Sequence, residues 1–166
     1  VCSSDLIGEA AQWATVLQQV RKQYPTARLL LTTSRRTPIT FEKELQQLAE
    51  QYGIFQPHDQ LTWVAQGQNC DIKDYIKAAD WILTSPDSTS MVAEVVMSGS
   101  KLLVLYDEQS MQDEQIKHQL KFLAQQHWLY LLTVSDSYQI SQVVQELEMQ
   151  DHTSEITRKL NRVLDK

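Results

Sequence analysis

One stretch, residues 79–106, constrains the fold more than any other part of the chain. It begins with the apolar run WIL, which is typical of a strand buried on both faces, and Pro86 in the next turn cannot continue a central strand. Gly99 then marks the end of a short helix, in which apolar residues recur at helical spacing: Met91, Val92, Val95 and Val96. A second apolar run follows and closes at Tyr106. Two strands joined through so short a helix must lie parallel, with the helix on one face of the sheet.

The polar turn between these two strands is a candidate anion site. In a parallel arrangement it lies at the carboxyl edge of the sheet, so Ser88, Thr89 and Ser90 come at the N-terminus of the helix. Unpaired backbone amides and the helix dipole favour a negative charge there. Ser, Thr and Asp are equally common as helix caps, so capping alone is the competing interpretation.

The rest of the chain alternates strands with helices in the same way. Strands are expected at residues 28–33, 60–65, 80–84, 101–106 and 128–133, and helices at 10–24, 40–52, 72–79, 111–127, 138–149 and about 156–164. This order predicts an α/β fold, a Rossmann-like three-layer structure with helices on both faces of a parallel sheet. At 166 residues the chain suits a single domain with a sizeable core.

The first six residues, VCSSDL, match what the end of a common short-read sequencing adapter encodes in one reading frame. We therefore expect residues 1–6 to be a non-native artefact and residues 7–166 to be one Rossmann-like domain of a protein cut at about Ile7. On this hypothesis Ile7 and Gly8 end a truncated first strand, and part of the protein is missing.

Charge and motif content exclude several classes of function. A net charge of -6 and a pI near 5.1 argue against a general nucleic-acid binder, which needs clustered Lys and Arg. No apolar run approaches the roughly 20 residues of a membrane span. Cys2 and Cys70 have neither metal-site spacing nor a disulfide pattern, so a reducing, cytoplasmic setting is expected. Neither strong phosphate-loop motif occurs, and no nucleophile or general base is identifiable.

The expected sheet places a second polar segment beside the turn. In an open parallel sheet of order 3-2-1-4-5-6, ligands bind where the strand order reverses. Gly8 and residues 87–91 would line that crevice, with the loop SRRTP at its side. Arg35 and Arg36 carry planar donors suited to phosphate or carboxylate, and Glu94 could accept from ribose hydroxyls. The alternatives are a solvated arginine pair and a glutamate on an exposed helix face.

Two motifs in this order and spacing resemble the mitochondrial-fission Elm-type family, which spans bacteria and plants. Residues 32–38 read TTSRRTP, as in the first family motif. The second motif is matched by eight positions: Ala79, Asp80, Thr84, Asp87, Ser88, Ser90, Met91 and Glu94. Members of the family look like glycosyltransferases of the GT-B class.

The resemblance implies that this chain is the C-terminal half of a two-domain GT-B-like protein and binds the nucleoside diphosphate of a sugar donor. Ser88, Ser90 and Met91 would contact phosphate, Glu94 would hold the ribose, and Arg35 or Arg36 would neutralise the leaving diphosphate without a metal. The full expected nucleotide-binding set is Gly8, Ser34, Arg35, Arg36, Asp87, Ser88, Ser90, Met91 and Glu94. The acceptor site and any catalytic base would lie in the missing N-terminal domain, so the isolated fragment is expected to be inactive.

Three functions remain open from the sequence. The first is a nucleotide-sugar-binding domain of a bacterial, metal-independent glycosyltransferase-like protein that needs no cofactor. The second is a non-catalytic binding or scaffold protein that retains the fold, and the third is an epimerase of nucleoside-diphosphate sugars. The expected location is the cytoplasm, with peripheral membrane association possible through the missing half.

Overall fold

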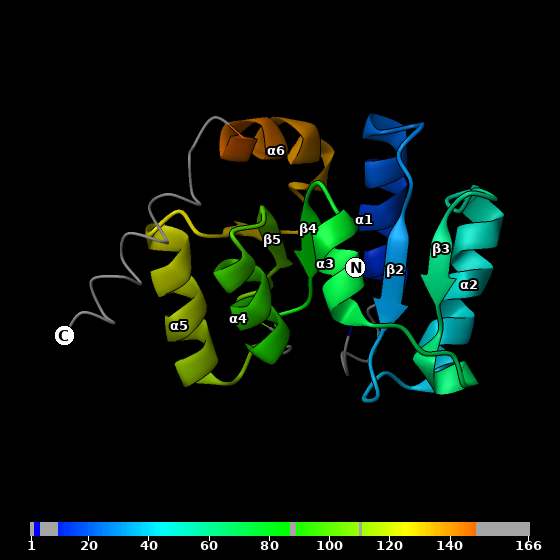
Figure 1. Ribbon diagram of the computed structural model, residues 1–166, viewed down its shortest axis with the longest axis horizontal. Helices are drawn as coiled ribbons and strands as arrows, with labels where there is room; N and C mark the ends of the chain where they lie inside the picture. The colour runs from blue at the N-terminus through cyan, green and yellow to red at the C-terminus, as the bar shows by residue number, and fades with distance from the viewer. Residues whose placement is uncertain (1, 4–9, 87–88, 110, 149–166) are drawn as a thin grey trace.

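The computed structural model describes residues 2–3, 10–86, 89–109 and 111–148. They form a single six-stranded sheet in the order β3-β2-β1-β4-β5-β6, and every neighbouring pair is parallel. The expected Rossmann-like α/β architecture and its strand order are therefore confirmed. Helices flank the strands, and in Figure 1 β2 and β3 lie to the right of β4 and β5. In the sheet order β1 lies between β2 and β4, and β6 lies beside β5.

The strands are short, and helices connect each strand to the next along the chain. The strands are β1 (Cys2–Ser3), β2 (Leu30–Thr33), β3 (Gln60–Thr62), β4 (Ile82–Thr84), β5 (Leu102–Leu105) and β6 (Tyr130–Leu132). The helices are α1 (Ala10–Gln23), α2 (Ile39–Tyr52), α3 (Ile72–Ala78), α4 (Thr89–Ser98), α5 (Glu114–Gln125) and α6 (Ile140–Glu148). Two 3-10 turns, η1 (Val64–Gln66) and η2 (Ser137–Gln139), follow β3 and precede α6.

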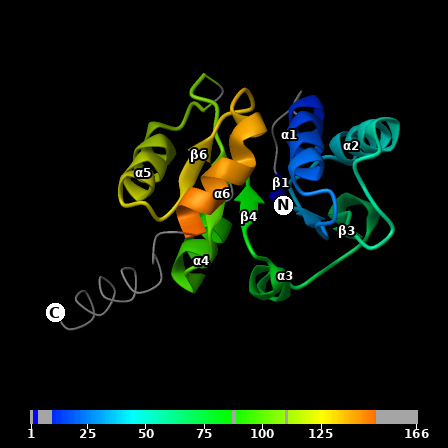
Figure 2. The same cartoon turned by 90° about the horizontal axis from the view of Figure 1, so that it is seen from above.

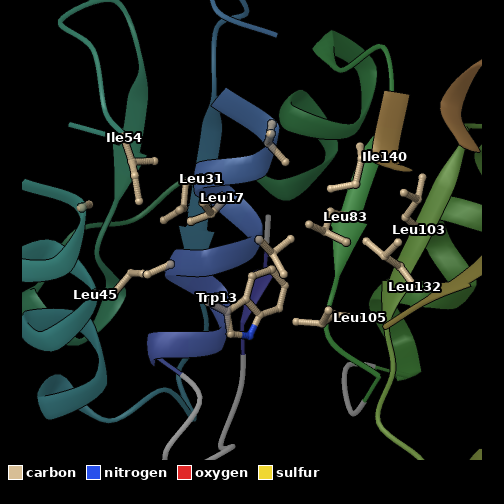
Figure 3. Packing of buried hydrophobic residues seen from close by; sticks show 14 of the residues in the cluster. Trp13, Leu17, Leu31, Leu45, Ile54, Leu83, Leu103, Leu105, Leu132 and Ile140 are labelled. Atoms are coloured by element: carbon tan, nitrogen blue, oxygen red, sulfur yellow. The ribbon is translucent and has the colours of Figure 1, made fainter. Parts of the chain in front are cut away.

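The sheet separates two hydrophobic cores. One contains buried residues of α1, α2 and α6, and the other contains those of α3, α4 and α5. The inner strand β5 is buried at every position, with Leu103 and Leu105 in the first core and Leu102 and Val104 in the second. Figure 2 shows the same layers from above, and Figure 3 shows Trp13 of α1 in the middle of the first core.

Two boundaries differ from the sequence prediction for identifiable physical reasons. The third strand was expected to continue to Ala65, but it ends at Thr62 because side-chain acceptors take the next amides: Val64 N–H donates to Thr33 Oγ1, and Ala65 N–H donates to Glu42 Oε1. The helix expected from residue 111 begins at Glu114, since the Asp113 carboxylate caps it by accepting from two backbone amides. The expected C-terminal helix at residues 156–164 lies outside the described residues.

The first strand also differs from the prediction. The place beside β4 that was expected for a strand ending at Gly8 is held by Cys2–Ser3, which pairs with Thr32 and Thr33 of β2 and with Thr84 of β4. Ile7 and Gly8 lie outside the described residues. The non-native origin of residues 1–6 stays a prediction, because a native and a non-native segment can pair with β2 and β4 in the same way.

Candidate functional site at the carboxyl edge of the sheet

The observed sheet brings the two polar segments to one edge. The loop at residues 34–38 follows β2, and the start of α4 follows β4. Because β1 lies between these two strands, their carboxyl ends are two strand spacings apart, about 9.5 Å. The chain order reverses at β1 and β4, which is where open α/β sheets bind ligands. The two segments therefore lie on either side of β1 at one edge of the sheet.

The loop that carries the two arginines is a closed hydrogen-bonded turn. Ser34 N–H donates to Thr37 Oγ1 at 3.0 Å, and Thr37 N–H donates to the Ser34 carbonyl oxygen at 3.1 Å. The Ser34 hydroxyl also accepts from Arg36 N–H at 3.3 Å. Ser34 is half-buried and Thr37 is buried, whereas both arginine side chains are exposed. The turn thus holds Arg35 and Arg36 out at the edge of the sheet.

A buried carboxylate, that of Glu42, binds the residue that precedes this turn. Glu42 of α2 has no exposed surface, and its oxygens accept from the Thr33 hydroxyl, from Ala65 N–H at 2.9 Å and from Gln66 Nε2 at 3.2 Å. These contacts join the carboxyl end of β2 and the segment after β3 to the first turn of α2. A carboxylate with several such donors is stabilised in its buried position. Sequence reasoning missed Glu42, because its exposed neighbours on α2 give it no distinguishing pattern.

The start of α4 is the second polar segment at this edge of the sheet. The helix begins at Thr89, and the side chains of Ser90 and Glu94 are exposed. Met91 is half-buried, and its Sδ accepts from the Thr84 hydroxyl at 3.9 Å. Gly99 has a φ of 75°, as expected for the residue that ends the helix.

The structure adds buried hydroxyls at the carboxyl ends of the strands. Thr32 and Thr62 are buried neighbours in β2 and β3, and Thr84 and Ser85 are fully buried at the end of β4. Sequence reasoning treated these residues as strand ends or turn. Their signal is three apolar strands that all end in threonine.

A charged group also follows β5 at this edge. The Tyr106 hydroxyl donates to Glu108 Oε2 at 2.8 Å, and Lys121 Nζ of α5 donates to Glu108 Oε1 at 2.9 Å. The hydrogen bond from Lys121 lowers the pKa of Glu108, and the same bond raises the pKa of Lys121. Burial, followed by the hydrogen bond to Glu108, raises the pKa of Tyr106 above its usual value near 10. Sequence reasoning did not find this group, since Lys121 is far from its partners along the chain.

The predicted nucleotide-binding set is thus brought together only in part. Ser34, Arg35, Arg36, Ser90, Met91 and Glu94 lie in the two segments at this edge, while Gly8, Asp87 and Ser88 lie outside the described residues. Within the described ranges, no group of three or more His, Cys, Asp or Glu residues is arranged to hold a metal. No helix among those residues is long and apolar enough to cross a membrane.

Comparison with protein families identifies the chain. The family model described as "Mitochondrial fission ELM1" matches residues 8–162 and so covers both motifs and all strands from β2 onward. The chain belongs to this family. No curated protein and no solved structure matches it significantly. The matched range includes the TTSRRTP segment and α4, which the fold places at one edge of the sheet.

Proposed function

We propose that this member of the fission family binds a nucleoside-diphosphate sugar and is the nucleotide-binding domain of a glycosyltransferase-like protein. The observation that carries the proposal is the pairing of β1 with both β2 and β4. Through this pairing the exposed Arg35–Arg36 turn and the start of α4 lie on either side of β1, at the same edge of the sheet. Guanidinium groups and helix amides are complementary to a diphosphate. A diphosphate between them would need no metal for charge neutralisation.

The sugar and ribose side of the proposal depends on Glu94. Its exposed carboxylate lies on α4 beyond the helix start, where it can accept hydrogen bonds from ribose hydroxyls. The acceptor substrate and a catalytic base would come from a further domain, since GT-B chemistry takes place between two domains. This domain alone would therefore bind the nucleotide sugar without transferring its sugar.

Calorimetric titration of the chain with UDP and with GDP tests the proposal. We expect saturable binding of at least one of them, with a dissociation constant that rises at least about tenfold for Arg35→Ala, because a charge-assisted hydrogen bond contributes roughly 1.5–3 kcal/mol. Glu94→Ala should weaken binding of the nucleotide but not of inorganic pyrophosphate. Arg28→Ala is the matched control, since it removes the same charge near the amino end of β2, at the opposite edge of the sheet.

The alternatives give different results in the same experiment. A folded chain that releases no heat with either nucleotide would refute the proposal and favour the scaffold function. Conversion of the sugar of a nucleoside-diphosphate sugar without any acceptor would favour the epimerase. Equal weakening by Arg28→Ala and Arg35→Ala would show that only general charge attraction is measured.

A further inference from the structure

One cavity in the described part of the chain lies in the plane of the sheet. Its volume is about 630 Å³, and its walls come from β2 and β4, the strands on either side of β1. On one side it reaches Leu17 and Val20 of α1, and on the other it reaches Tyr75 and Ile76 of α3. These two helices cover opposite faces of the sheet, so the cavity passes through the sheet layer.

The cavity continues the line of β1 toward its amino end. The described pairing of β1 begins at Thr32 on one side and at Thr84 on the other. The cavity extends back from Thr32 to Ala27, which corresponds to roughly 16 Å of extended chain. On the β4 side it extends back to Asp80. The neighbouring strands are thus longer than the part of β1 that fills the space between them.

The cavity walls are also less well covered than a central sheet should be. Leu30 and Trp81 are half-buried although they lie at the amino ends of β2 and β4, whereas every residue of β5 is buried. Inner strands of a parallel sheet are normally covered on both faces by helices and on both edges by other strands. Apart from the edge strands β3 and β6, this partial exposure occurs at the amino end of β2 and just before β4, the two strands that border β1.

We propose that this cavity is the binding slot for an extended apolar segment of polypeptide that continues β1 on its amino-terminal side and pairs in parallel with β2 and β4. Its carboxyl end would meet Cys2–Ser3 on the same line between β2 and β4. It is apolar at successive positions, because alternate side chains would face α1 on one side and α3 on the other. A strand is favoured over a small molecule because the walls are the edges of two parallel strands about 9.5 Å apart, which is the spacing that one strand fills.

The test extends the 166-residue chain at its amino end by four residues in three versions: Val-Ile-Val-Ile, Val-Pro-Val-Pro and Gly-Ser-Gly-Ser. The first version can pair and fill the slot, the second is apolar but lacks two of the ladder donors, and the third is polar and flexible. We expect only Val-Ile-Val-Ile to raise the melting temperature, by roughly 5–10 °C, and to slow amide hydrogen exchange in β2 and β4.

Two results would overturn the proposal. Equal melting temperatures for the three extensions would show that the slot takes no strand. A gain shared by the proline version would show that an apolar tail adheres to the surface without pairing. Leu30→Lys provides the matching change in the wall, because this half-buried position tolerates a lysine and places a charge beside the slot. It should at least halve the gain from Val-Ile-Val-Ile while leaving the Gly-Ser version unaffected.

Discussion

The buried ion pair between Arg21 and Asp59 gives the sharpest stability prediction. The Asp59 side chain has no exposed surface, and its Oδ2 accepts from Arg21 Nη2 at 2.7 Å and from Gln56 N–H at 2.8 Å. Its Oδ1 accepts from Leu29 N–H at 2.9 Å. Arg21 in turn donates through Nε to the Ile54 carbonyl oxygen at 2.8 Å. The pair therefore joins α1 to the loop before β3 and to the start of β2.

Asp59→Asn should lower the free energy of unfolding by about 3–5 kcal/mol, the usual cost of removing one partner of a buried ion pair. An asparagine of the same size keeps one oxygen for Leu29 N–H, but its NH₂ group then faces donors from Arg21 and Gln56. A buried donor left without an acceptor adds to the loss. For a chain of this size the melting temperature should fall by roughly 6–20 °C.

Urea denaturation followed by tryptophan fluorescence measures this change, with an unchanged slope if the unfolded state is unaffected. Glu114→Gln is the control, because this carboxylate is 85 % exposed and lies 3.4 Å from Lys117, so its removal should cost at most about 1 kcal/mol. If Asp59→Asn cost no more than Glu114→Gln, the inference that the buried pair stabilises the junction would be wrong.

Three further predictions follow from single side chains. Glu42→Gln should destabilise the chain by about 1–3 kcal/mol in urea titration, because one of its oxygens becomes a donor that faces other donors; an unchanged midpoint would refute this. Gly53→Ala should cost about 1 kcal/mol through its φ of 63°, not through a clash, since no atom lies within 4 Å of an added Cβ; Gly53→Asn should cost less. The pKa of Glu108 is lowered in the folded chain, so the contribution of Glu108 to stability is present above its unfolded pKa and is lost as pH falls through its folded pKa. Lys121→Met should raise the folded pKa of Glu108 in an NMR titration, and an unchanged pKa would exclude the ion pair as the cause of the shift.

The order of the strands could be predicted because it follows from alternation and chain topology. Short apolar runs that alternate with segments of helical periodicity leave few alternatives to a parallel sheet with a switch point. The helices that end at Gly53 and Gly99 have a local signal, because a glycine there can adopt a positive φ. These features depend on residues close together in the sequence. The helices therefore appear where the pattern places them, within a few residues.

The side chains that shape the candidate site could not be predicted in the same way. Glu42 ends β3 by binding Ala65 N–H, 23 positions away along the chain, and Lys121 binds Glu108 from the next helix. Such partners are selected by packing between elements, which no local pattern records. For the same reason the contact between the Thr84 hydroxyl and Met91 Sδ was not predicted.

Strand β1 connects the two proposals, because it alone separates the Arg35–Arg36 turn from the start of α4. A diphosphate that bridges both segments requires β2 and β4 to keep one strand between them at their carboxyl ends, and Cys2–Ser3 already provides this pairing. The slot lies at the other end of the same strand, where added residues would fix β2 and β4 along their length. An extension of β1 can therefore stabilise the chain whether or not a nucleotide binds at the carboxyl edge of the sheet. Nucleotide binding needs only the carboxyl ends of β2 and β4, which Cys2–Ser3 already holds together. Because the two proposals depend on opposite ends of one strand, a failure of either leaves the evidence for the other unchanged.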